Sequence, residues 1–78
     1  MELDNDRIDE AVLALLFLGR HEGTRAWKSF DWAAMERLHA KGLILDPVGS
    51  AKSVVFTEEG LRQAEELSRK LFERKHPK

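Results

Sequence analysis

The sequence contains no cysteine, and this absence excludes two common ways of stabilising a small protein. No disulfide can cross-link the chain, and a zinc site built from thiolates is excluded as well. The chain has 78 residues, which predicts a single domain spanning 1–78. A domain of this size buries only about 60% of the surface that its unfolded chain exposes. Self-association is one way in which such a chain gains stability.

The chain also lacks an excess of charge of either sign, since its formal net charge is only −1. This balance excludes a strong overall attraction to nucleic acid or to acidic lipid. The charge is unevenly placed, however: residues 1–23 carry six acids and two bases, whereas 24–56 carry three acids and five bases. Residues 57–78 carry five acids and six bases. The acidic part of the chain is therefore its N-terminal third.

Long hydrophobic runs are missing too. The longest apolar run is "AVLALLFL" at 11–18, and a membrane-spanning helix needs about 20 residues. The preceding segment "MELDNDRIDE" is acidic, whereas a signal peptide has a basic segment before its apolar run. We expect a cytoplasmic protein that has no membrane partner.

Two helices are predicted in the first half of the chain. The first covers about 5–18, with competent N-caps at Asp4, Asn5 and Asp6. The second covers 32–41, and Gly42 stands where a left-handed residue commonly ends a helix. The apolar stripe expected on the first helix comprises Ile8, Ala11, Val12, Leu15 and Leu16. The stripe expected on the second comprises Trp32, Met35 and Leu38, with His39 among them.

A β-hairpin and a third helix are predicted in the second half. The segments 43–45 and 53–56 are apolar and β-branched, and "DPVG" at 46–49 is typical of a type I turn between strands. Thr57 is the expected N-cap of a helix over 58–74. Its expected stripe comprises Leu61, Ala64, Leu71 and Phe72. The fold class is therefore α+β, with three main helices and a two-stranded antiparallel hairpin between the second and the third.

The order of helix, glycine, hairpin, threonine and helix resembles the second half of a winged-helix domain. "MERLHAKGLI" is similar to a recognition helix that leads into the first wing strand, and "VVFTEEGLRQAEEL" resembles the return strand and next helix of MarR and PadR regulators. The resemblance covers about 31–67. It departs from these families at 19–30, where two glycines and no helical period replace the scaffold helix that a helix-turn-helix needs. The segment reads as a loop with a short extended piece at 26–28.

The whole chain also resembles a family of short uncharacterised bacterial proteins, through the blocks "IDEAVLALL", "RAWKSFDW" and "AKSVVFTEEG". This resemblance implies a bacterial origin. It implies no activity.

Several apolar side chains face away from the predicted stripes. In the hairpin, Leu43 and Leu45 are expected on one side with Val54 and Phe56, and Ile44 and Val55 on the other. Exposed apolar patches commonly mark contacts between proteins. Either the third helix and the aromatic segment around Trp27 cover these side chains, or they contact a partner. The predicted contact residues are Leu13, Phe17, Ile44, Val55 and Trp27.

A DNA-binding regulator is the alternative function. It would present the helix 32–41 and the wing 46–52 as a symmetric dimer. The predicted DNA contacts are Arg37, Lys41, Lys52, Arg25 and Lys28. Specific DNA-binding proteins commonly neutralise about 6–10 phosphates, so five bases diluted by three acids support this alternative weakly.

No pattern in the chain is typical of an enzyme. None of its serines lies in a G-x-S-x-G turn, and the three histidines lack the spacing of metal ligands. We expect no catalytic residue, metal, cofactor or small-molecule substrate. The preferred prediction is a small non-enzymatic protein-interaction module that forms a homodimer or binds a protein partner.

Overall fold

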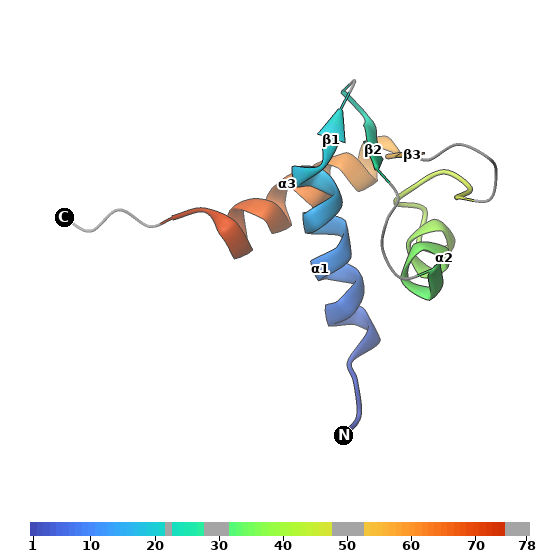
Figure 1. Ribbon diagram of the computed structural model, residues 1–78, viewed down its shortest axis with the longest axis vertical. Coiled ribbons are helices and arrows are strands. Elements are labelled where there is room, and N and C mark those ends of the chain that lie inside the picture. Colours follow the sequence, from blue (N-terminus) through green and yellow to red (C-terminus); the bar gives the residue numbers. More distant parts are fainter. Residues whose placement is uncertain (22, 28–31, 48–52, 75–78) are drawn as a thin grey trace.

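The computed structural model describes residues 1–21, 23–27, 32–47 and 53–74. The described chain forms a small α+β fold with three helices and three short strands (Figure 1). In chain order the elements are α1 (Asn5–Leu18), β1 (Arg20–His21), β2 (Arg25–Trp27), α2 (Trp32–Ala40), β3 (Ser53–Val55) and α3 (Glu58–Phe72). The three predicted helices are confirmed, with starts as predicted for all three.

The predicted helix caps fix these starts. The Asp4 side chain accepts hydrogen bonds from the backbone N–H groups of Asp6 and Arg7, at 3.0 and 3.3 Å. The Thr57 hydroxyl accepts one from the Gly60 N–H at 2.9 Å and donates one to the Gly42 carbonyl at 2.7 Å. Gly42 has φ of +77°, the left-handed conformation expected after α2. Local polar chemistry therefore sets where α1 and α3 begin and where α2 ends.

The segment between α1 and α2 differs from the expected loop. It contains the antiparallel strands β1 and β2, which pair Arg20 with Ala26 and His21 with Arg25. Gly23, with φ of +77°, lies in the connection between these strands, where a residue with a Cβ would be strained. Strand β2 also pairs with β3, which gives a three-stranded sheet in the order β1-β2-β3. A hairpin thus stands where a scaffold helix would precede a recognition helix.

The predicted hairpin between α2 and α3 is confirmed, and a winged-helix-like layout is compatible with it. Ile44 forms an isolated antiparallel bridge with Phe56, and the Leu45 N–H donates to the Val55 carbonyl at 2.9 Å. The predicted facing of the hairpin was wrong by one residue in its first strand. Ile44 shares the buried side with Val54 and Phe56, whereas Leu45 is exposed, as a shift of one position predicts. Leu43 does not follow the shift and stays buried, at 6% exposed.

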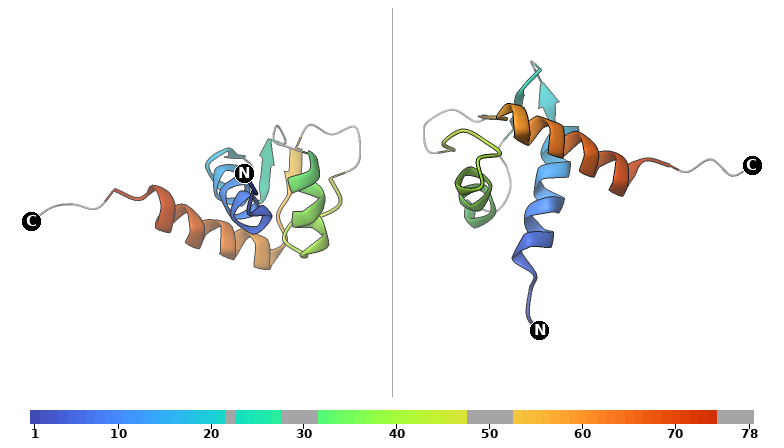
Figure 2. Two further views of the ribbon diagram at one scale, coloured as in Figure 1. Left: turned by 90° about the horizontal axis from the view of Figure 1, so that it is seen from below. Right: turned by 180° about the vertical axis from the view of Figure 1, so that it is seen from behind.

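Helix α1 lies between α2 and α3 and organises the core (Figure 2). Its buried face is turned relative to the predicted stripe, because Leu15 is exposed and Ala11 lies at the surface. Helix α2 buries Ala34, Met35 and Leu38, while Trp32 and His39 are exposed. The buried residues of α1 are Asp9, Val12, Leu13, Ala14 and Leu16.

The first turns of α3 approach the chain just after α2 very closely. A Cβ placed on Gly60 would lie 1.7 Å from the Leu43 carbonyl oxygen. The Thr57 N–H donates to the same carbonyl at 3.1 Å. Only glycine fits this contact, and it fixes the direction in which α3 leaves the sheet.

Candidate functional site

A buried carboxylate joins α1 to α2. Asp9 is 2% exposed and accepts hydrogen bonds from Arg37 Nε to both of its oxygens, at 3.0 and 2.9 Å. Arg37 also reaches Asp9 through its NH2 group at 2.9 Å. Lys41 Nζ lies 2.9 Å from the second oxygen of Asp9 and 3.3 Å from an oxygen of Asp6. A bidentate arginine and a lysine therefore hold one carboxylate, an arrangement with strong charge-assisted bonds.

The electrostatics of this cluster favour the charged forms of Asp9 and Lys41. Burial is the largest single influence and alone would raise the pKa of the Asp9 carboxyl, but the hydrogen bonds from Arg37 and Lys41 together with their positive charges hold that pKa below its ordinary value. The hydrogen bond to Asp9 raises the pKa of Lys41, against the smaller opposing effect of burial. The cluster is an internal link between helices whose charges largely neutralise one another.

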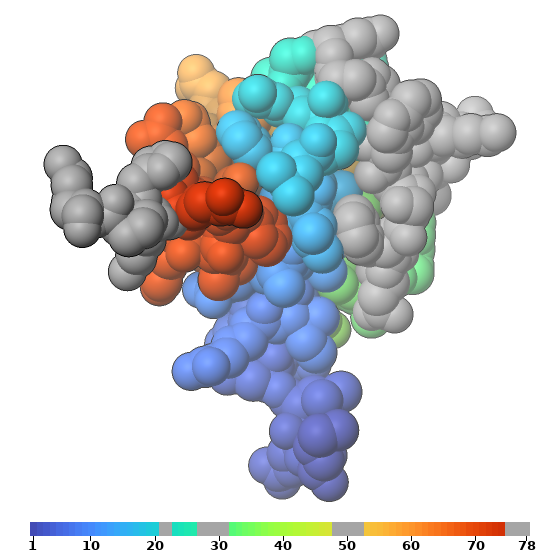
Figure 3. Space-filling view, turned by 60° about the vertical axis from the view of Figure 1, so that its left-hand side comes forward, coloured from blue at the N-terminus to red at the C-terminus, as the bar shows by residue number. Residues whose placement is uncertain are grey.

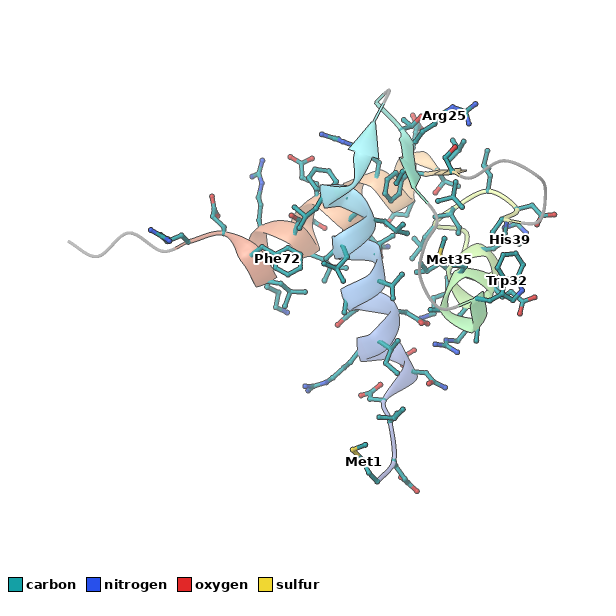
Figure 4. The ribbon with its side chains drawn as sticks, in the orientation of Figure 1. Met1, Arg25, Trp32, Met35, His39 and Phe72 are labelled. Carbon is teal, nitrogen blue, oxygen red and sulfur yellow. The ribbon has the colours of Figure 1, made fainter. Side chains whose placement is uncertain are left out.

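The two basic residues of α2 were predicted to contact DNA. The structure does bring Arg37 and Lys41 together, but it turns both toward α1, where each bonds to Asp9. Their side chains remain 31% and 40% exposed. Arg25 is exposed on β2, on the side of the molecule away from α1's start (Figure 4). The predicted contacts Lys28 and Lys52, and most of the wing, lie outside the described residues.

The predicted partner contacts differ in how far the chain itself buries them. Leu13 and Ile44 are each 1% exposed, so for these two residues the alternative of cover within the chain holds and they are not available as partner contacts. They belong to the core because α1 and the hairpin are covered on two sides by the same chain. Phe17 is half-buried beneath the Arg20 guanidinium, whose carbon lies 4.3 Å from the ring centroid, and Val55 is half-buried as well. The Trp27 side chain lies outside the described part of the structure.

An apolar surface outside the predicted contact residues lies on α1 and α3. Leu71 is 50% exposed and Phe72 is 43% exposed, although both were assigned to a buried stripe. On α1, Ala11, Leu15 and Leu18 stand at i, i+4 and i+7 and therefore share one face. We call Ala11, Leu15, Leu18, Leu71 and Phe72 the α1–α3 apolar patch.

The two halves of this patch meet in the structure. Ala11 and Leu71 line the same notch between the helices, together with Arg7, Glu10 and Lys70. Figure 3 looks toward the outer end of α3 and shows that end beside α1. Figure 4 places Phe72 at this outer end. The available sequence signal was the length of the α3 stripe, which continues to Leu71 and Phe72, about one turn beyond Ser68, the last buried residue of the helix.

A groove of about 640 Å³ lies between the three helices, next to the Asp9 cluster. Its apolar lining includes Leu13, Leu38, Leu43 and Leu67. Most of the charged groups around it already have partners within the chain, since Lys41 bonds to Asp9 and Arg62 bonds to Glu66. The groove therefore offers little net charge to select a ligand.

The described residues also lack two kinds of feature. No group of three or more histidine, aspartate or glutamate side chains in this part of the chain is placed to hold a metal ion. In the same residues, no helix combines the length and the apolar character needed to cross a membrane.

Comparison with known proteins identifies a family, and the description of that family gives no activity. Residues 4–74 match the family model described as "Domain of unknown function (DUF6429)". The "Uncharacterized protein y4hR" of Sinorhizobium fredii is 61% identical over 74 residues, which cover 95% of this chain and 100% of that protein. No solved structure matches the chain.

Proposed function

Because the chain belongs to the DUF6429 family, whose description gives no activity, we propose from its surface that it is a small non-enzymatic interaction module that self-associates. The observation that carries this proposal is the α1–α3 apolar patch. Four large apolar side chains, each 39–60% exposed, gather on two crossing helices: Leu15, Leu18, Leu71 and Phe72. Scattered exposed leucines are ordinary, whereas a contiguous apolar patch commonly marks a contact with another protein.

The patch does not lie on a frayed helix end, because an ion pair and a backbone hydrogen bond hold the last turns of α3. The last turns of α3 carry the ion pair Arg69–Glu65 at 2.8 Å, and the Glu73 N–H still donates to the Arg69 carbonyl at 3.2 Å. A helix that is formed and amphipathic, yet uncovered over its last turns, needs a further surface for its apolar side.

Binding of DNA through α2 stays a prediction with less support. Arg37 and Lys41 would have to give up bonds to Asp9 in order to contact phosphates, which would leave a 2% exposed carboxylate without partners. Such a loss is costly, since an unpaired buried charge destabilises a protein by about 3–5 kcal/mol.

The proposal is tested by replacing Leu71 and Phe72 with aspartate in one double variant. We expect the wild-type chain to sediment as a dimer at micromolar concentrations and L71D/F72D to sediment as a monomer. Both side chains are already about half exposed, so the far-ultraviolet circular dichroism of the variant should match that of the wild type.

A matched control is Leu45→Asp. Leu45 is 53% exposed but belongs to the hairpin and not to the patch, so L45D should leave the mass unchanged. A wild-type chain that remains monomeric up to millimolar concentration would overturn the proposed function. Equal effects of L45D and L71D/F72D would show that the patch is not the contact surface.

A further inference from the structure

Helix α2 is held against the rest of the chain by one side. Among the elements that the structure describes, α1 is the one on which α2 packs most. The helix buries Ala34, Met35 and Leu38, and Figure 4 shows Met35 on the side toward α1 and Trp32 on the opposite side. A helix of 9 residues is too short to be stable by itself in water. The helical state of α2 therefore depends on its packing against the rest of the chain.

The C-terminal end of α2 is attached to the start of α3, independently of α1. The Thr57 hydroxyl donates to the Gly42 carbonyl at 2.7 Å, and the Thr57 N–H donates to the Leu43 carbonyl at 3.1 Å. Gly42 itself has φ of +77°. Residues at the ends of elements absorb the dihedral changes of hinge motions, and glycine has the widest range of dihedral angles. Gly42 is therefore a fixed point about which α2 is able to turn.

The two bases that hold Asp9 lie at different distances from this point. Lys41 directly precedes Gly42, whereas Arg37 stands five residues before it, more than one helical turn away. A rotation of α2 about Gly42 therefore moves Arg37 farther than Lys41. The Arg37 side chain is already 31% exposed, so its guanidinium enters water readily. Lys41 stays close enough to Asp9 to compensate the buried carboxylate, which avoids the cost of an unpaired buried charge.

We propose that α2 opens as a unit about Gly42 while α1, α3 and the sheet stay packed. The bonds between Asp9 and Arg37 are the latch that breaks, whereas Lys41 keeps its bond to Asp9. Opening uncovers the leucines that line the groove between the three helices near α2, which are Leu13, Leu38 and Leu43. The latch thus controls access to an apolar site. This device does not involve the α1–α3 apolar patch, and it stands whether or not the chain self-associates.

Thiol labelling tests the opening directly. The chain contains no cysteine, so a single introduced thiol reports how often its own position opens. Ala34→Cys on α2 and Ala64→Cys on α3 are a matched pair, because both alanines are 0% exposed. At a dilution where the chain is monomeric, we expect A34C to react with a thiol reagent at least about tenfold faster than A64C. Urea should accelerate A64C more steeply, because its reaction requires unfolding of more of the chain.

Two variants then separate the latch from the bond that is kept. R37M removes a bond that exists only in the closed form, so it should accelerate the labelling of both A34C and A64C about tenfold. K41M removes a bond that exists in the closed and the open form alike. It should therefore accelerate A64C several-fold and leave A34C within about twofold of its rate in the parent. Equal acceleration of A34C by R37M and K41M would overturn the rotation about Gly42.

Amide hydrogen exchange of the unaltered chain gives a second readout, which does not depend on the folding of any variant. We expect the amides of 36–40 in α2 to exchange at least about tenfold faster than those of 64–68 in α3, with a weaker dependence on urea. One common rate and one common urea dependence for the two helices, by labelling or by exchange, would show that α2 opens only when the whole chain unfolds. That result would overturn the proposal and leave the proposed function standing.

Discussion

The two halves of α3 have the same amphipathic pattern, but the rest of the chain covers the apolar side of the first half and leaves that of the second half partly exposed. In the first half, Gly60 lies against the Leu43 backbone and Ala64 is fully buried. In the second half, Leu71 and Phe72 are about half exposed. The period of a helix thus reveals which of its sides is apolar, but it does not reveal whether the same chain supplies the cover. That difference separates what stabilises this fold from what is available to a partner.

The largest expected effect comes from closing the tight contact in the first half of α3. Gly60→Ala would place a methyl group on the Leu43 carbonyl oxygen, where backbone rather than a flexible side chain must move. We expect a loss of about 3 kcal/mol or more in the free energy of unfolding. Urea denaturation followed by circular dichroism measures this loss.

Gly19→Ala is the matched control for that substitution. Gly19 has φ of −89°, and a Cβ there would meet only the carbonyl oxygens of Leu16 and Leu15, at 3.8 and 3.9 Å. The free energy of unfolding of G19A should differ from that of the wild type by less than about 1 kcal/mol. If G60A were as stable as G19A, the contrast between the two halves of α3 would be broken.

An intermediate effect is expected at Asp9, which supports the covered side of the molecule without touching the outer half of α3. The pKa of Asp9 is lowered in the folded chain, so its contribution is complete above the ordinary value near 3.8 and is lost as the pH falls through the folded pKa. Asp9→Asn should lose about 1–2 kcal/mol at pH 7, a value reduced because Arg37 and Lys41 are partly exposed. Its stability should also fall less steeply between pH 5 and pH 2.

Urea titrations of D9N at a series of pH values check this slope, with Asp6→Asn as the control. Asp6 also bonds to Lys41, but its side chain is 86% exposed. D6N should therefore follow the wild-type curve closely. A D9N curve parallel to that of the wild type at acid pH would show that the buried carboxylate does not contribute through its charge.

The smallest effect on stability is expected in the outer half of α3. Leu71→Ser and Phe72→Ser remove apolar side chains that the monomer covers only in part. Measured at a dilution where the chain is monomeric, each should change the free energy of unfolding by less than about 1 kcal/mol. If either variant lost as much free energy of unfolding as G60A, the outer half of α3 would be covered within the monomer, and the two halves would not differ.

Much of the fold could be predicted because local chemistry fixes it. Asp4 and Thr57 cap the helices that were expected to begin after them, and Gly42 takes the left-handed conformation that its position after α2 requires. The hairpin between α2 and α3 follows from two β-branched segments around a turn. In each case the decisive interactions join residues that are close in sequence.

The remaining features depend on contacts between distant residues, which periodicity does not reveal. Asp9 is buried because Arg37 and Lys41, 28 and 32 residues away, neutralise it, so an apolar stripe could not have included it. Strands β1 and β2 are too short to show alternation, and β2 depends on pairing with β3. The α1–α3 apolar patch was not predicted as such because Leu15, Leu71 and Phe72 were assigned to the apolar stripes of their helices.

The sheet is joined to its surroundings through main-chain atoms. The Phe56 N–H donates to the Thr24 carbonyl at 2.8 Å, and the Thr57 N–H donates to the Leu43 carbonyl at 3.1 Å. Bonds of this kind survive when side chains are exchanged, because every residue except proline supplies the same donor and acceptor. A proline at 56 or 57 would remove one of these donors, whereas a proline at 24 would keep the carbonyl that accepts.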